Sequence, residues 1–257
     1  MTRLVTSLDE WQKVRAGLSG PLGFVPTMGA LHDGHLALVR RCREECASLV
    51  VSVFVNPTQF NDPGDLEKYP RDLDRDRELL DGAGVDVILA PGFDAIYPDG
   101  FRYRVVESET SRVLEGADRP GHFDGVLTVV MRLLNVVRPA RAYFGEKDWQ
   151  QLLLVGEMVE AFFMDVEIVP CPIVRAPDGL ALSSRNALLD TSGRARAAQF
   201  ARLLAAGPDA QTVDAKLRER GFEVDYVEER WGRRLAAVRI GDVRLIDNVP
   251  ATESPGQ

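Results

Sequence analysis

Two histidines three residues apart are the first residues of the chain whose types and spacing could do chemistry. His32 and His35 lie in the stretch Pro26–His35, which follows apolar residues 22–25 and precedes an amphipathic run from Leu36. The order is therefore strand, glycine-containing loop, helix. A helix N-terminus at the carboxyl end of a parallel strand presents unpaired backbone N–H groups and the positive end of the helix dipole. We expect this loop to bind an anion such as a phosphate.

A second loop has the same order. Gly145, Glu146, Lys147 and Asp148 follow an expected strand, residues 141–144, and open a helix predicted to reach residue 163. Lys147 and Asp148 could be a surface ion pair. Two strand-to-helix loops that meet at one edge of a sheet make phosphate and metal handling the better interpretation.

Two further runs carry polar groups of suitable kinds. Ser183, Ser184 and Arg185 offer two hydroxyls and a planar guanidinium fork, which suit a phosphate, although the same run could be only a helix cap. Gln59 follows an apolar strand, residues 49–55, that ends at Asn56. Gln59 lies at a strand's carboxyl end, where ligands bind. We therefore weigh two interpretations equally: a residue that contacts substrate, and an ordinary turn residue.

Other conspicuous residues are interpreted as structural. Cys42 and Cys46 fall on the apolar face of the helix expected at residues 34–47, and they lack the further ligands of a zinc site. A helix expected at residues 66–81 carries Asp72, Asp74 and Asp76, and such a run of acidic residues indicates a face exposed to solvent. A single histidine in a loop is more often structural than catalytic, and His122 is interpreted in that way.

Alternating strands and helices up to residue 171 predict an α/β fold with a doubly wound parallel sheet. The expected strands of this part are residues 22–25, 49–55, 85–90, 141–144 and 166–171. The expected helices are residues 7–17, 34–47, 66–81, a long apolar helix after Gly125, and the helix that ends at residue 163. Residues 103–106 are expected to form an outlying strand and residues 108–114 a short helix.

The last part of the chain has a different pattern. Helices at residues 191–205 and 209–220 are followed by strands at residues 222–228, 233–240 and 243–248. We therefore predict a doubly wound α/β domain at residues 1–174, which contains both strand-to-helix loops, and a small C-terminal α+β domain at residues 175–257.

Composition narrows the class of protein. The chain has 257 residues, 45% of them hydrophobic and 27% charged, with a net charge of −8 that argues against nucleic acid as a partner. Three cysteines, the absence of a signal-peptide pattern and the absence of a long apolar run indicate a cytoplasmic protein without a membrane partner. No dinucleotide fingerprint (Gly-x-Gly-x-x-Gly) follows the first strand and no P-loop is present, which excludes the usual dehydrogenase and NTPase motifs.

The motifs taken together resemble a known family. His32-Asp33-Gly34-His35 matches the His-x-Gly-His signature of the nucleotidylyltransferase superfamily and of class I aminoacyl-tRNA synthetases. The runs that occur with it, in order, are Pro26–His35, Phe54–Phe60, Tyr69-Pro70-Arg71, Phe144–Asp148 and Ser183–Asn186. This set resembles the pantoate–β-alanine ligase (pantothenate synthetase) family, densely over residues 20–190 and more loosely at Leu245–Asn248. The chain departs from the family in Trp149, where a Tyr is common, and in a shorter connection between residues 228 and 233.

The resemblance implies a Rossmann-like fold, a homodimer and a two-step reaction. ATP and (R)-pantoate give pantoyl adenylate and pyrophosphate, and the amine of β-alanine then attacks the acyl carbon to give pantothenate and AMP. The implied catalytic residues are His35 as proton donor, His32, Lys147, Arg185, Ser183 and Ser184. Gln59 and Gln151 are implied to contact pantoate, and Asp148 to hold Mg²⁺ or touch the ribose. The residues implied to bind ATP are Met28, Gly29, Ala30, Leu31, His32, Asp33, Gly34, His35, Gly145, Glu146, Lys147, Asp148, Val174, Leu182, Ser183, Ser184 and Arg185. The C-terminal domain is implied to be a lid over the ATP.

Three alternatives remain open at this stage. The first is another nucleotidylyltransferase that uses the same His-x-Gly-His loop. The second is a metal hydrolase with His32, His35 and His122 as ligands. The third is a binding module that has lost catalysis.

Overall fold

A parallel six-stranded sheet forms the framework of the larger of two structural units. The structure is a computed structural model, and it describes residues 2–251. The larger unit contains the chain up to Glu146 together with Gln150–Cys171, and the smaller unit contains Lys147–Trp149 and the chain from Pro172 onward. The strand order is β1-β4-β3-β2-β5-β6, and every pairing is parallel. The strands are β1 (Arg3–Val5), β2 (Leu22–Thr27), β3 (Ser48–Val53), β4 (Val87–Leu89), β5 (Arg141–Gly145) and β6 (Glu167–Cys171).

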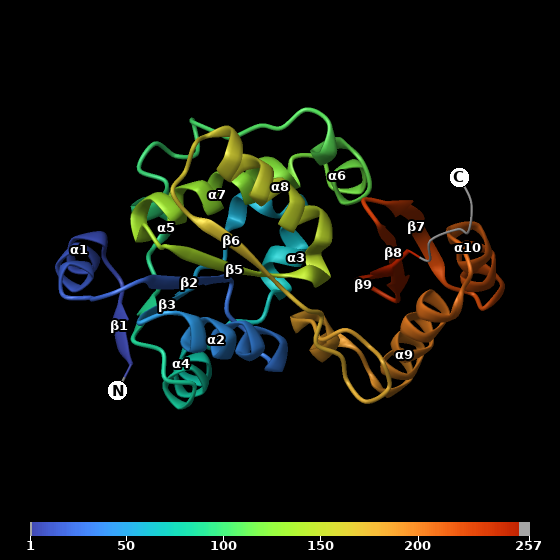
Figure 1. The fold of residues 1–257 in the computed structure, drawn as a ribbon. Helices are drawn as coiled ribbons and strands as arrows, with labels where there is room; N and C mark the ends of the chain where they lie inside the picture. Colours follow the sequence, from blue (N-terminus) through green and yellow to red (C-terminus); the bar gives the residue numbers. More distant parts are fainter. Residues whose placement is uncertain (1, 252–257) are drawn as a thin grey trace. The chain divides into compact units, whose positions relative to one another are not determined.

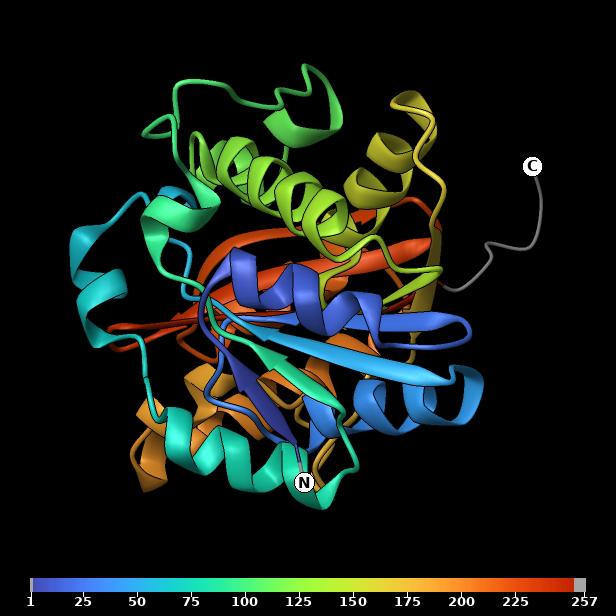
Figure 2. The ribbon, with the colours of Figure 1, turned by 90° about the vertical axis from the view of Figure 1, so that its left-hand side faces the viewer.

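Helices cover both faces of this sheet. Figure 1 and Figure 2 show α7 and α8 on one face and α2 and α4 on the other. The α-helices of this unit are α1 (Leu8–Ala16), α2 (Asp33–Glu45), α3 (Pro63–Lys68), α4 (Leu73–Gly82), α5 (Phe93–Ile96), α6 (Glu115–Asp118), α7 (His122–Val137) and α8 (Trp149–Ala161, whose first residue belongs to the smaller unit). Short 3₁₀ turns are η1 (Pro57–Gln59), η2 (Thr110–Arg112) and η3 (Glu146–Asp148). The predicted doubly wound α/β class is confirmed.

The strand order places a topological switch point between β2 and β5. The chain passes from β2 to β3 and β4 on one side, and later returns to β5 and β6 on the other side. In open α/β sheets, ligands bind at the carboxyl ends of the strands beside such a point. The histidine loop leaves the end of β2, and the Gly145–Asp148 loop leaves the end of the neighbouring strand β5.

The core of the larger unit is continuous and apolar. Val25, Leu49, Val51 and Ile88 from the central strands are 0% exposed and pack with α2 and α4. Cys42 and Cys46 lie in the same cluster, so the prediction that they serve packing is confirmed. Together with the buried Cys171, they are free thiols.

Several element predictions were wrong. The strand β1 was missed, because three residues are too few to show a periodic pattern. One helix was predicted over residues 66–81, but α3 and α4 form instead, because Pro70 cannot continue α3 and Asp72 caps a new helix. Residues 103–106 form no strand: the amide of Val105 donates to Thr128 Oγ1 rather than to a sheet. Residues 108–114 contain only the turn η2.

The smaller unit is an antiparallel sheet packed on two helices. The strands β7 (Glu223–Arg230), β8 (Arg233–Ile240) and β9 (Val243–Pro250) pair in sequence order, and α9 (Thr191–Ala206) and α10 (Ala210–Glu219) supply Phe200, Leu204 and Leu217 to the core. A 3₁₀ turn, η4 (Ser184–Leu188), precedes α9. The predicted helix-then-strand pattern of this region is confirmed. In the described chain, residues 2–251, no helix has the length and apolar character needed to cross a membrane.

Candidate active site

The loop between β2 and α2 is held in a bent conformation by its own glycine and by neighbouring side chains. Gly29 has φ +81° and Ala30 has φ +50°, in the left-handed region. A Cβ atom on Gly29 would lie 2.8 Å from Asp76 Oδ2 and 3.0 Å from Val53 Cγ1, so no larger residue fits there. Thr27 Oγ1 accepts a hydrogen bond from the Gly29 amide at 3.2 Å and donates to Ser52 O at 2.6 Å.

A buried carboxylate holds this loop by hydrogen bonds to its backbone amides. Asp76, on α4, is 1% exposed, and its two oxygens accept hydrogen bonds from the amides of Ala30 (2.9 Å) and Leu31 (2.8 Å). Burial raises the pKa of Asp76, and the two backbone hydrogen bonds oppose that shift. The interpretation of this acidic helix as a solvated face is therefore wrong for Asp76, although Asp72 and Asp74 are exposed.

The two histidines cap the helix that they open. His32 is the N-cap of α2, and its Nδ1 accepts a hydrogen bond from the Gly34 amide at 3.1 Å. His35 Nδ1 accepts one from the His32 amide at 3.4 Å. A ring nitrogen that accepts carries no proton, so each neutral imidazole carries its hydrogen on Nε2. The two rings lie 4.1 Å apart between centroids, and this local arrangement supplies two ring donors at one helix N-terminus.

Asn56 fixes the orientation of the amide of Gln59. Asn56 is 1% exposed; its Oδ1 accepts from the amide of Thr58, and its Nδ2 donates to the carbonyl of Gly125. Because those backbone groups cannot exchange roles, Asn56 must donate to Gln59 Oε1, at 3.1 Å. The Nε2 donors of Gln59 therefore face away from Asn56.

Gly125 allows this arrangement. A Cβ atom on it would lie 2.4 Å from Thr58 O and 2.7 Å from the amide of Gln59, so α7 touches the backbone of η1. His122 is the first residue of α7 rather than a loop residue. It is buried, with its Nδ1 2.8 Å from Gln59 O and its Nε2 3.2 Å from Arg119 Nη1. These contacts support the structural interpretation of His122.

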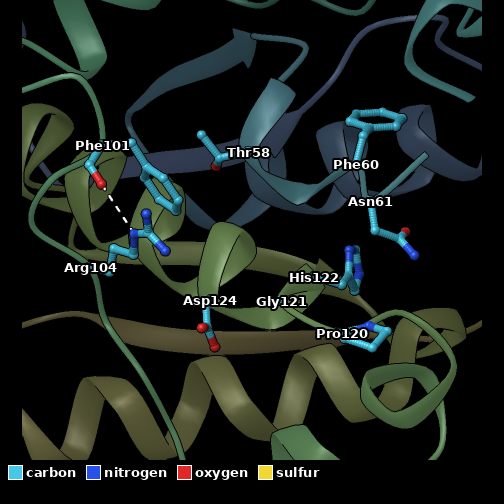
Figure 3. Close-up of a pocket in the computed structure, with 9 residues that line it drawn as sticks. All are labelled: Thr58, Phe60, Asn61, Phe101, Arg104, Pro120, Gly121, His122 and Asp124. Atoms are coloured by element: carbon cyan, nitrogen blue, oxygen red, sulfur yellow. Dashed lines mark hydrogen bonds between the residues drawn. The ribbon is translucent and has the colours of Figure 1, made fainter. Parts of the chain in front are cut away.

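A cavity of about 160 Å³ lies beside the start of α7. Figure 3 shows His122, Asp124 and Thr58 at its wall, with Arg104 donating to the Phe101 carbonyl. None of the residues predicted to contact substrate lines it.

The second loop divides between the two units. Gly145 and Glu146 belong to the larger unit, whereas Lys147, Asp148 and Trp149 belong to the smaller one. Lys147 Nζ lies 3.8 Å from Asp148 Oδ1, with side-chain exposures of 18% and 47%. The carbonyl of Lys147 accepts a hydrogen bond from Asn248 Nδ2 at 3.0 Å.

Two adjacent glutamines follow this loop and differ in their surroundings. Gln150 is 2% exposed; it donates to the carbonyls of Thr110 and Val113 and accepts from the amide of Glu115, so it fixes a neighbouring turn. Gln151, the predicted pantoate contact, is only half-buried.

The remaining predicted ATP residues lie in the smaller unit. The Leu182 amide donates to Val174 O at 3.0 Å, which brings these two residues side by side. Ser183 is the N-cap of η4, and its Oγ accepts from the amide of Arg185 at 3.3 Å. Ser184 lies on that turn, so both hydroxyls and the guanidinium occupy one short segment. Ser183 therefore caps a helical turn, as the sequence allowed.

Asp76, Asn56 and Asn248 were not proposed as site residues from the sequence. Asn56 lies inside a quoted motif, which could have drawn attention to it. Asn248 closes the loosely matching run Leu245–Asn248, which could also have drawn attention to it. Asp76 contacts backbone groups that are distant in sequence, and nothing local distinguishes it.

The ligands available for a metal are few. Among residues 2–251, no group of three or more His, Cys, Asp or Glu side chains could hold a metal ion. A hydrolase with His122 as a ligand would need such a group, and His122 already contacts Gln59 O and Arg119. Mg²⁺ on a nucleotide needs only one or two protein carboxylates beside the phosphates, and the half-exposed carboxylate of Asp148 fits that requirement.

Comparisons with known proteins agree over nearly the whole chain. The family model described as pantoate-beta-alanine ligase matches residues 1–250. The pantothenate synthetase of Bdellovibrio bacteriovorus is 53% identical over 249 residues, covering 97% of this chain and 99% of the relative. That of Coxiella burnetii is 48% identical over 251 residues, with 97% of each covered.

Solved structures give the same result. The pantoate-beta-alanine ligase of Francisella tularensis, complexed with beta-gamma ATP and beta-alanine, has a TM-score of 0.93 and 39% identity, covering 97% of this chain and 98% of that one. The pantothenate synthetase of Thermus thermophilus has a TM-score of 0.90 and 46% identity, covering 97% and 99%. The chain belongs to the pantoate–β-alanine ligase family.

Proposed function

We propose that this chain condenses (R)-pantoate with β-alanine at the expense of ATP, through an enzyme-bound pantoyl adenylate. Family membership over residues 1–250 supports the overall reaction. The observation that carries the assignment of the site is the pair of histidine Nε2 donors at the N-terminus of α2, beside the switch point of the sheet. The Francisella tularensis relative, solved with beta-gamma ATP and beta-alanine, supports ATP and β-alanine as ligands.

In the first step, a carboxylate oxygen of pantoate attacks the α-phosphorus of ATP, and the bond from that phosphorus to the pyrophosphate oxygen breaks. We assign His32 and His35 to the triphosphate as Nε2–H hydrogen-bond donors. The family resemblance gives His35 the further role of proton donor, for which its Nδ1 must release the His32 amide and take up a proton before Nε2 gives one to the leaving pyrophosphate. The amides of Ala30 and Leu31 donate to Asp76, so we do not assign them to the phosphates. The contribution of this loop then rests on the histidines and on the N-terminal end of α2.

Positive charge is proposed to come from the segments of the smaller unit. Lys147 and Arg185 would neutralise charge that develops on the leaving pyrophosphate, and Ser183 and Ser184 would donate to its oxygens. Asp148 would hold Mg²⁺, which supplies further neutralisation of the triphosphate. The smaller unit is accordingly proposed to act as a lid over the ATP.

Pantoate is proposed to bind Gln59 and Gln151. The amide of Gln59 is oriented by Asn56, so its Nε2 can donate to the substrate carboxylate without adding like charge. In the second step, the β-alanine amine forms a C–N bond with the acyl carbon, the bond from that carbon to the AMP oxygen breaks, and the amine loses a proton.

The setting of the enzyme is also a proposal. Three free buried thiols accord with a reducing, cytoplasmic compartment. A homodimer is proposed from the family resemblance, and light scattering on the purified protein would test it.

A pyrophosphate-release assay tests the function. With ATP and pantoate but no β-alanine, we expect one equivalent of pyrophosphate per active site, and adding β-alanine should give continuous turnover with AMP as product. Pyrophosphate release that does not depend on pantoate would support a different nucleotidylyltransferase. Turnover that is absent although ATP binds would indicate a binding module.

A variant tests the role of the histidine loop. His35→Ala should reduce pantoate-dependent pyrophosphate release by about 10²-fold or more, in the range for loss of a proton donor. Its fold should stay nearly intact, because His35 is only half-buried. Pyrophosphate release at the wild-type rate in this variant would contradict the assignment.

A further inference from the structure

We propose that Asn248 is a positioning residue for Lys147, acting through the main-chain carbonyl of the lysine. This inference rests on the proposed role of Lys147 in adenylate formation. It concerns a residue 101 positions further along the chain, on the last strand, that carries no reactive group.

The strands β8 and β9 contact the segment Lys147–Trp149 at two points. Asn248 Nδ2 donates to Lys147 O at 3.0 Å. The guanidinium of Arg233 lies over the ring of Trp149, 4.3 Å from its centroid, and Arg233 Nη1 also donates to Asn248 Oδ1 at 3.3 Å. All of these residues are in the smaller unit, which therefore holds the lysine segment by its own contacts.

The amide of Asn248 can adopt only one orientation. A guanidinium only donates and a carbonyl only accepts, so Oδ1 must face Arg233 and Nδ2 must face Lys147. The main chain of Asn248 is fixed as well: its amide donates to Asp247 Oδ1 at 2.7 Å, and its carbonyl accepts from Arg175 at 3.0 Å. Arg175 in turn binds both oxygens of Asp247, at 2.7 and 2.9 Å.

The two β9 residues at the centre of this network are buried, which restricts their movement. Asn248 is 1% exposed and Asp247 is 3% exposed. Lys147, in contrast, has a long flexible side chain. Its ammonium group can neutralise a developing charge only if the main chain of Lys147 is correctly placed. A fixed Lys147 carbonyl sets the origin and direction of that side chain, and loss of the fixation should lower the rate of the adenylation step.

Two variants remove the donor in different ways. Asn248→Asp keeps the volume and the acceptor for Arg233 but turns an acceptor toward the Lys147 carbonyl, whereas Asn248→Ala removes the side chain. Both should lower kcat for pantoate-dependent pyrophosphate release by about tenfold, the loss expected for one buried hydrogen bond. The KM for pantoate should stay within about twofold, because Gln59 and Gln151 are unaffected.

A double-mutant cycle separates positioning from a general structural effect. In a Lys147→Ala background, Asn248→Asp should cause no further loss, because the group that it positions is gone. Arg244→Ala, on the same strand as Asn248, is the matched control. It removes an ion pair to Asp225 of β7 (2.6 Å) and should lower stability without a selective loss of adenylation. If the Asn248 loss persists in full in the Lys147→Ala background, or if Arg244→Ala causes the same kcat loss, the proposal is overturned.

The outcome also distinguishes this inference from the proposed function. If Lys147→Ala alone leaves pyrophosphate release unchanged, the assigned role of Lys147 fails. If Lys147→Ala abolishes release while Asn248→Asp and Asn248→Ala behave as wild type, only the positioning role of Asn248 fails.

Discussion

Buried polar side chains without a reactive role determine where the reactive ones stand. Asp76 binds two amides of the histidine loop, and Asn56 orients Gln59. Each is 1% exposed and meets backbone groups whose donor or acceptor role is fixed. Removing one partner of such a set leaves a buried group unsatisfied, which costs about 1–3 kcal/mol. Substitution of these supports should therefore affect activity through geometry.

Asp76→Asn tests this for the histidine loop. An amide offers one acceptor where the loop presents two donors, so either Ala30 or Leu31 loses its partner. We expect a free energy of unfolding lower by about 1–3 kcal/mol and a tenfold or larger loss of pyrophosphate release, measured by urea titration and by the assay above. Asp74→Asn on the exposed side of the same helix is the control and should match wild type. Equal activity of the two variants would contradict the supporting role of Asp76.

The adjacent glutamines offer a second test. Gln151→Ala should raise the KM for pantoate with little change in stability, because Gln151 is half-buried and is proposed to contact the substrate. Gln150→Ala should lower stability by about 1–3 kcal/mol, because the carbonyls of Thr110 and Val113 and the amide of Glu115 each lose their hydrogen bond to its side chain. Thermal unfolding measures the stability of each variant, and pantoate titrations measure its KM. We expect the stability loss only in Gln150→Ala and the KM increase only in Gln151→Ala. The reverse pattern would show that the substrate contact had been assigned to the wrong glutamine.

At the scale of elements, the close contact between α7 and η1 sets the position of Gln59, the proposed pantoate contact. Gly125→Ala would bring a methyl group to within 2.4 Å of Thr58 O, so η1 must move and carry Gln59 with it. We expect a loss of stability of about 1–3 kcal/mol and a higher KM for pantoate. Gly156→Ala on α8, where no atom lies within 4 Å, is the matched control and should stabilise the fold by about 0.5–1 kcal/mol. An unchanged pantoate KM in Gly125→Ala would mean that η1 does not set the position of Gln59.

The sequence predicted the helices and strands well where the signal was local. The apolar runs at β2, β3 and β5 and the strand–loop–helix order identified the sheet and both loops, because those patterns follow from burial over short distances. Asp76 was misread because an acidic run on a helix is usually solvated, and only the fold brings it under Ala30 and Leu31. The contact between Asn248 and Lys147 is equally non-local, since it joins the last strand to a loop near the middle of the chain.

In the whole molecule, the proposed ATP ligands are divided between two units that are each internally compact. His32 and His35 belong to one unit, whereas Lys147, Ser183 and Arg185 belong to the other. If both sets bind one triphosphate, ATP with pantoate should slow amide hydrogen exchange in residues 28–36 and in residues 183–189 together, because a ligand that binds only the native arrangement suppresses local opening of every segment it contacts. β-Alanine alone should protect neither segment, and the same measurement on Lys147→Ala should show weaker protection of residues 183–189 than of the histidine loop. Protection confined to residues 28–36 in the wild type would contradict the proposal that the smaller unit contributes to the ATP site.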